Sequence, residues 1–105
     1  ENYIVIHTLT SKEIVHLRLK SIQETLPAQI FMQVHRSFIV NLSYVQAIEG
    51  NLLIIGEHKI PVSRPLREEV YNRSSIINSF KDKYPKTNTL FIIEHFKYSY
   101  LSDYQ

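Results

Sequence analysis

Two short polar stretches of this 105-residue chain carry side chains that suit recognition of a polyanion. The first is His35, Arg36 and Ser37, which lies between the apolar segments 31–34 and 38–40. A rigid turn between buried segments would present a cation and hydrogen-bond donors to a partner. The alternative is a solvated turn whose histidine is satisfied inside the core.

The second stretch is Ser63 and Arg64, between a predicted strand and a predicted helix start. Free backbone N–H groups and a partial positive charge at such a place can receive a phosphate. Arg64 has the reach and the forked donors to contact guanine O6 and N7 in a major groove. Arg67 is placed one turn on, where a backbone phosphate would lie. The alternative is a surface arginine paired with Glu68 or Glu69.

The elements that must position these residues are mostly strands, because β-branched and aromatic runs alternate with turn residues. Apolar residues at Leu19, Ile22 and Leu26 predict a short helix ended by Pro27, and a second helix is expected from Pro65. Asn41 is predicted to cap a turn. The expected strands are residues 3–9, 13–19, 31–34, 38–40, 44–48, 52–55 and 59–62.

Composition excludes several classes of protein. The chain has no cysteine, which rules out disulfides, thiolate zinc sites and a cysteine nucleophile. Its only glycines are Gly50 and Gly56, too few for a phosphate-cradling glycine loop, so we expect no enzyme and no cofactor. His7 and His16 could approach each other on paired strands in some registers, but without a third ligand we predict no metal site. No apolar run is long enough to span a bilayer, and a cytoplasmic location without membrane contact is expected.

Charge does not define the class, because Lys and Arg total 12 against 10 acidic residues. Any surface for nucleic acid must concentrate its positive charge on one face. The chain starts at Glu1 and its only methionine is Met32, so we expect a piece of a longer protein. The composition changes after Arg73. Of the 12 Phe and Tyr residues, 7 lie in 74–105, and segment 89–100 is strongly β-prone.

Two strings taken together resemble the LytTR family of bacterial DNA-binding domains. They are VHRSFIVN at residues 34–41 and IPVSRPLREEV at residues 60–70. The stretches ENYIVIH at 1–7 and RLKSIQETLP at 18–27 fit the same pattern in the same order. The resemblance covers about residues 1–73. It lacks the family's first strand, before Glu1, and it does not account for residues 74–105.

The resemblance implies a mainly β fold of stacked antiparallel sheets whose loops, rather than a recognition helix, enter two successive major grooves and the minor groove between them. It also implies the output domain of a response regulator in a two-component system, which controls transcription from behind an upstream receiver domain. The expected partner is double-stranded DNA at paired repeats, with a homodimer on DNA as one arrangement. The implied DNA-binding residues are Asn2, Tyr3, His35, Arg36, Ser37, Lys59, Ser63, Arg64 and Arg67.

The domain prediction is therefore a LytTR-like DNA-binding domain at 1–73 and an aromatic-rich C-terminal extension at 74–105. The extension could cover the edge left by the missing strand, or it could be foreign to the domain. The alternative function is a protein-interaction module in which segment 89–100 pairs with a partner or with itself. The sequence leaves open which contacts are to bases and which to phosphates.

Overall fold

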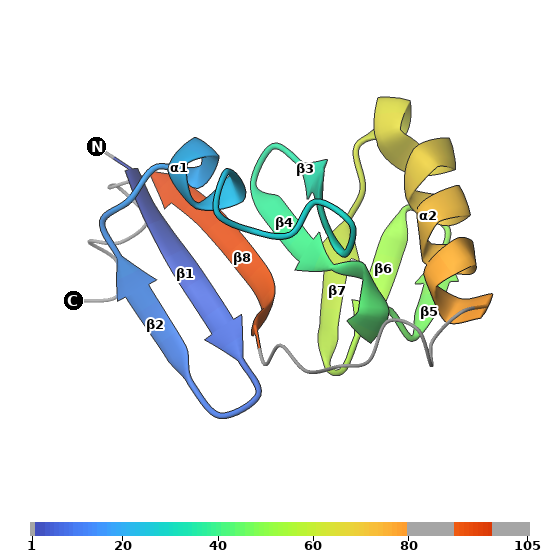
Figure 1. The fold of residues 1–105 in the computed structure, drawn as a ribbon, viewed down its shortest axis with the longest axis horizontal. Helices are drawn as coiled ribbons and strands as arrows, with labels where there is room; N and C mark the ends of the chain where they lie inside the picture. Colours follow the sequence, from blue (N-terminus) through green and yellow to red (C-terminus); the bar gives the residue numbers. More distant parts are fainter. Residues whose placement is uncertain (1, 80–89, 98–105) are drawn as a thin grey trace.

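The computed structural model describes residues 2–79 and 90–97 of the chain. In these ranges eight strands form two antiparallel sheets, accompanied by two α-helices and two short 3-10 helices. The fold is therefore mainly β, as the sequence predicts. Figure 1 shows the larger sheet on the left and the smaller sheet beside the long helix on the right.

The larger sheet has five strands in the order β2-β1-β8-β4-β3, and every neighbouring pair is antiparallel. Two local hairpins form its outer parts, and β8 lies between them. The strands are β1 (Asn2–Thr8), β2 (Lys12–Val15), β3 (Phe31–His35), β4 (Phe38–Asn41) and β8 (Leu90–Lys97).

The smaller sheet is a three-stranded meander in the order β5-β6-β7. Its two turns place Gly50 and Gly56 at φ +60, a left-handed conformation that costs glycine little. Each glycine is the first residue of a two-residue loop, the position that type II′ hairpin turns require. The strands are β5 (Ala47–Glu49), β6 (Leu52–Ile55) and β7 (His58–Pro61).

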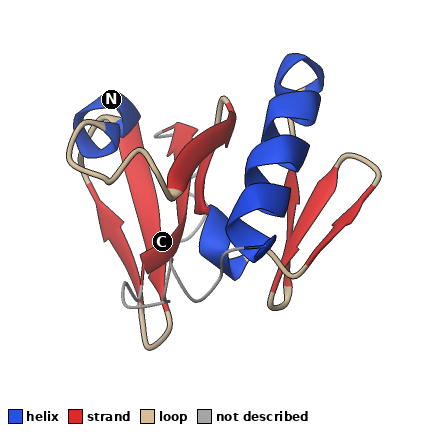
Figure 2. Cartoon of the chain, turned by 45° about the vertical axis from the view of Figure 1, so that its right-hand side comes forward, coloured by secondary structure: helices blue, strands red, loops and turns tan. Residues whose placement is uncertain are grey.

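The helices cover the sheets from different sides. The short α1 (Leu19–Gln23) lies over the five-stranded sheet, and α2 (Arg67–Ser79) lies against the strands of the second sheet (Figure 2). The 3-10 helices η1 (Leu42–Tyr44) and η2 (Arg64–Leu66) precede β5 and α2. Within the described ranges, neither α-helix combines the length and apolarity that crossing a bilayer requires.

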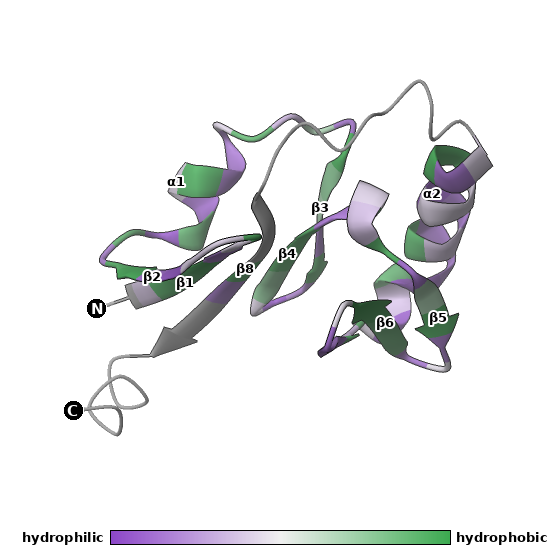
Figure 3. Ribbon diagram, turned by 90° about the horizontal axis from the view of Figure 1, so that it is seen from below, coloured by the Kyte–Doolittle hydropathy of each residue, from purple (hydrophilic) through white to green (hydrophobic). Residues whose placement is uncertain are grey.

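Two clusters of buried apolar side chains fill the fold. The larger lies between α2, the second sheet and the β3–β4 hairpin, and Val34, Leu53 and Val70 in it are at most 1% exposed. The green, hydrophobic β5 and β6 lie beside α2 in Figure 3. Because successive strand residues point to opposite faces, β3 and β4 supply side chains to both clusters and so join them. The buried members of the smaller cluster are Ile4, Phe31, Ile39 and Ile93.

Strand β8 lies in the middle of the larger sheet. It pairs with β1 from Asn2 to Thr8 and with β4 from Phe38 to Val40, and Ile93 is 0% exposed. Strand β1 is therefore paired on both sides, with β2 and with β8. The described part of the β-prone segment 89–100 is thus a strand, while 89 and 98–100 lie outside the described residues.

Most predicted elements are present, with differences at their ends. The partner of β1 stops at Val15, shorter than the predicted 13–19. Segment 44–48 becomes a strand only at Ala47, since η1 includes Tyr44 and residues 45 and 46 connect it to β5. The last helix begins at Arg67, since η2 takes up the turn around Pro65, and it continues to Ser79.

Asn41 caps a turn, as predicted. The residue is buried, with 1% of its surface exposed. Its side-chain oxygen accepts hydrogen bonds from the Ser43 N–H at 3.0 Å and from the Ser43 hydroxyl at 2.5 Å. This side chain ends β4 and starts η1.

We predict that Asn41→Ala lowers the free energy of unfolding by about 1–3 kcal/mol, because a buried donor loses its acceptor. Urea denaturation monitored by circular dichroism would measure the change. The control is Asn51→Ala in the exposed β5–β6 turn, which we expect to stay within about 0.5 kcal/mol of wild type. Equal losses in the two variants would contradict the capping role.

Candidate nucleic-acid interface

Two of the predicted DNA-binding segments lie at the same end of the five-stranded sheet. Asn2 and Tyr3 begin β1. Glu94 of β8 pairs with Val5 of β1 on one side and with Phe38 of β4 on the other. The turn that precedes Phe38 is therefore placed level with the first residues of β1 (Figure 1).

The third segment is tied to this end by the backbone. The Ser63 N–H donates to the Val34 carbonyl at 2.8 Å, and the Val62 N–H donates to the Asn51 carbonyl at 2.8 Å. Val62 itself is buried. Ser63 and Arg64 thus follow a fixed strand end beside β3, and the three predicted segments meet along one edge of the molecule.

The β3–β4 turn is organised by its histidine. His35 is half-buried, its ring lies 5.7 Å from that of Phe38, and its Nδ1 accepts the Ser37 N–H at 3.1 Å. A neutral imidazole that accepts at Nδ1 carries its proton on Nε2, where it is a donor. Arg36, at the tip, is exposed. The turn therefore contains a half-buried histidine that stabilises its backbone and, next to it, an exposed arginine that a partner could contact.

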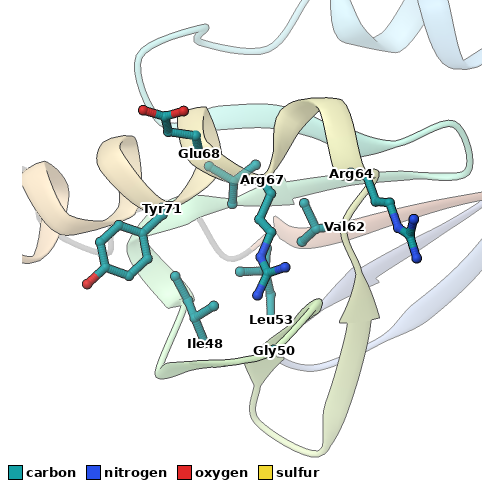
Figure 4. Close-up of a pocket in the computed structure, with 9 residues that line it drawn as sticks. Ile48, Gly50, Leu53, Val62, Arg64, Arg67, Glu68 and Tyr71 are labelled. Atoms are coloured by element: carbon teal, nitrogen blue, oxygen red, sulfur yellow. The ribbon is translucent and has the colours of Figure 1, made fainter.

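Arg64 and Arg67 flank a groove of about 500 Å³ between the start of α2 and the second sheet. In Figure 4 Arg67 lies across the groove above Leu53, whereas Arg64 extends away from it. Both arginines are exposed, and within the described residues neither forms an ion pair with Glu68 or Glu69. The predicted alternative of a paired surface arginine is not what the structure contains.

Lys59 is the predicted residue that lies apart from the others. It is exposed on β7, next to His58, whose ring contacts His7 near the far end of β1. Ser63 lies four residues further along the chain, a distance of about 13 Å in extended backbone. The structure thus brings together eight of the nine predicted residues and places Lys59 toward the opposite end of the sheets.

Arg73 has a role that the sequence did not reveal. Its guanidinium donates to the Ala28 carbonyl at 2.6 Å, which fastens α2 to the segment before β3. Together with His35 and Arg36 it lines a second groove of about 410 Å³ at the same edge. The two partners of this hydrogen bond are 45 residues apart in the sequence, so no local sequence pattern could have predicted the role of Arg73.

The register separates the two histidines that were considered as metal ligands. His16 lies just after β2 and stacks on Tyr3, with ring centroids 4.9 Å apart. His7 lies opposite Lys12 and contacts His58, with ring centroids 5.1 Å apart. The two imidazoles therefore do not form a pair. In the described part of the chain, no group of three His, Asp or Glu residues could hold a metal ion.

His7 instead takes part in a polar cluster that joins both sheets. Its Nε2 lies 3.5 Å from Oε2 of Glu94 on β8. The hydrogen bond from His7 lowers the pKa of Glu94 below its ordinary value of 4.5, with nearby Lys12 acting in the same direction and burial opposing it. Burial, followed by the charge of His7, lowers the pKa of His58 below 6.5, whereas Glu57 and Glu94 raise it.

The comparisons with known proteins agree with this architecture. The family model described as the LytTr DNA-binding domain matches residues 1–75. The chain therefore belongs to the LytTR family of DNA-binding domains.

Similar curated proteins carry the description "Sensory transduction protein LytT". The chain is 32% identical to that of Bacillus cereus over 73 residues, which is 64% of this chain and 30% of the relative. It is 33% identical to that of Bacillus subtilis over 76 residues, covering 67% of this chain and 32% of the relative. It is 34% identical to that of Enterococcus faecalis over 71 residues, covering 62% of this chain and 25% of the relative. The matched region thus spans about a third of these relatives or less. No solved structure matches the chain.

We predict that acidification destabilises the fold in two steps. The folded-state pKa of His58 lies below 6.5, so its contribution to stability is present above that pH and is lost as pH falls toward the lower folded value. The contribution of Glu94 is present above pH 4.5 and is lost as pH falls through its lowered folded-state pKa. Urea denaturation between pH 7.5 and 3.5 would measure both steps.

Two variants assign the steps to the residues. His58→Gln should flatten the step below pH 6.5, and Glu94→Gln should flatten the step below pH 4.5. Glu13→Gln, on the exposed face of β2, is the control and should leave both in place. A pH profile that is unchanged by both cluster variants would contradict the assignment.

Proposed function

We propose that the edge formed by the start of β1, the β3–β4 turn and the Ser63–Arg64 segment binds double-stranded DNA in a sequence-specific manner. The observation that carries the proposal is the convergence of these segments, which are far apart in the chain, on one side of the molecule with Arg36, Arg64 and Arg67 exposed. Membership of a DNA-binding family supports the same partner.

The dimensions of the molecule suit contact with successive grooves. Its longest axis is 42 Å, slightly more than the roughly 34 Å of one turn of B-DNA. The three segments follow one another along that axis in Figure 1. In this proposal, as the family resemblance implies, long side chains at the two ends of the edge reach toward neighbouring major grooves, and the central turn lies over the minor groove between them.

The chemistry of the side chains suggests a division of roles. Arg64 extends freely from η2, and its planar fork matches the two acceptors of guanine. Arg36 and Arg67 are exposed cations suited to phosphates, while Ser37, Ser63 and the Nε2–H of His35 provide short-range hydrogen bonds. Asn2 and Tyr3 would supply the base contacts of the first segment. Lys59 would reach a phosphate only at the margin of the footprint.

For the whole protein we propose a bacterial transcription regulator with a receiver domain upstream. The relatives are named as sensory transduction proteins and are about three times as long as the matched region. In this proposal residues 1–73 supply the DNA contacts, and two copies occupy paired repeats because one such domain has a modest footprint.

A protein-interaction role for the C-terminal strand has less support. An added strand needs an open sheet edge. Strand β8 already pairs with β1 on one side and with β4 on the other. These intramolecular pairings use the backbone N–H and C=O groups of β8 that a partner strand would need.

We predict that selection of duplexes from a random library at about 150 mM salt enriches a motif with two short elements about one helical turn apart. Arg64→Ala should weaken binding by about 1–3 kcal/mol and blur one position of the motif. Arg64→Lys keeps the charge but lacks the fork, so it should blur the same position with a smaller loss of affinity.

The control is Lys12→Gln at the opposite end of the five-stranded sheet, which removes a charge without touching the edge. It should leave the motif unchanged. If the folded wild-type domain enriches no motif, sequence-specific binding is wrong, and self-association through the C-terminal segment becomes the next function to measure.

The salt dependence of binding gives an independent prediction. Arg67→Gln should reduce the slope of log K against log salt by about 0.9, because one phosphate contact is lost, and should weaken all sequences alike. Lys59→Gln should reduce it less, since Lys59 lies away from the edge. Filter binding between 50 and 200 mM salt would measure the slopes. A larger effect from Lys59→Gln would place the DNA on a different face.

A further inference from the structure

Strand β8 is the element that joins the two hairpins of the larger sheet. Within the described residues, β1 pairs with β2 and β8, and β4 pairs with β3 and β8, so backbone hydrogen bonds connect β1 to β4 only through β8. The first predicted DNA-binding segment lies on one side of β8 and the second lies on the other.

The contacts of β8 hold both neighbours in a defined register. Ile93 pairs with Ile6 of β1 and with Ile39 of β4. Its side chain is 0% exposed and packs in one cluster with Ile4, Phe31 and Ile39. The next residue, Glu94, lies 3.5 Å from His7. A slip of one residue would turn Ile93 to the other face and break both contacts.

This strand lies outside the residues that the family model matches, which end at 75. We infer that β8 is a positioning strand for DNA recognition, which sets the separation between the Asn2–Tyr3 segment and the β3–β4 turn at two interstrand spacings. Two spacings amount to about 10 Å. Without β8, each hairpin would keep its own turn, but their separation would no longer be fixed. The inference rests on the proposed function and assigns a C-terminal element to it.

The key comparison uses two isoleucine truncations in the full chain. Ile93→Ala removes the central side chain of β8 and leaves every predicted DNA-binding residue in place. Ile77→Ala makes the same chemical change in α2, at a site that is 4% exposed and belongs to the other cluster. Both variants lose comparable burial, but only Ile93→Ala loosens β8.

The first readout is the separation of the two segments. The chain has no cysteine, so Asn2→Cys and Arg36→Cys introduce the only two spin-label sites. At a backbone separation of about 10 Å, dipolar broadening of continuous-wave electron paramagnetic resonance spectra reports the distance, and it should give a narrow distance distribution in the otherwise native chain and in Ile77→Ala. It should give a broadened one in Ile93→Ala. Equal distributions in Ile93→Ala and Ile77→Ala would overturn the inference.

The second readout is the profile of selected DNA. Asn2→Ala and Arg64→Ala first identify the base positions that depend on the first and third segments. Ile93→Ala should then lose discrimination at the Asn2-dependent positions by roughly 5- to 150-fold, the loss expected for a missing base contact, and keep the Arg64-dependent positions. Ile77→Ala should weaken binding uniformly or not at all. A uniform loss in Ile93→Ala, matching that of Ile77→Ala, would contradict positioning.

Milder variants keep the inference testable if Ile93→Ala does not fold. Glu94→Ala removes the side chain that contacts His7, and Ile93→Val keeps a branched apolar side chain that should restore both readouts. If Glu94→Ala is folded and has wild-type distances and selection, the inference fails. If the wild-type chain selects no motif while the distances behave as expected, the proposed function fails and the positioning of the two segments stands.

Discussion

Antiparallel pairing of β8 with both β1 and β4 is the constraint on which the larger sheet depends. Without it, the β1–β2 and β3–β4 hairpins would each expose an open edge, and the smaller cluster would lose Ile93, one of its four buried members. Strands β3 and β4 also supply side chains to the core under α2, so the pairing of β8 with β4 connects the larger sheet to that core as well. The last described strand thus supports β1 and β2, which come first among the described elements.

The candidate interface follows a common division between scaffold and contact residues. The side chains proposed to meet DNA lie mostly on turns or at strand and helix starts, next to strands that contribute to the core. Val34 and Val62 flank the β3–β4 turn and Ser63, and the backbone hydrogen bond between Ser63 and Val34 holds the two turns together. Exposed arginines can then differ in reach without any change in the scaffold.

Local patterns were sufficient to predict much of the fold. The hairpins around Gly50 and Gly56, the helix at Leu19 and Ile22, and the cap at Asn41 depend on neighbours within a few residues, and each is present. The resemblance also identified the segments that meet at one edge. The remaining features depend on contacts across the chain. A β-prone segment around Ile93 predicts a strand but not its partners, and the pairing of His7 with Glu94 rather than His16 follows from the register of three strands.

The central place of β8 also has a consequence for how the protein is made. The pairing of Asn2 with Lys97 joins residues at nearly opposite ends of the chain, a contact order far higher than that of the hairpins. A ribosome delivers β8 after all the other described elements, so the β5–β7 meander and α2 can form while the first hairpin still has an uncovered edge. The larger sheet closes only after synthesis has passed β8, and a nascent chain interrupted before β8 would present two unpaired strand edges to its neighbours.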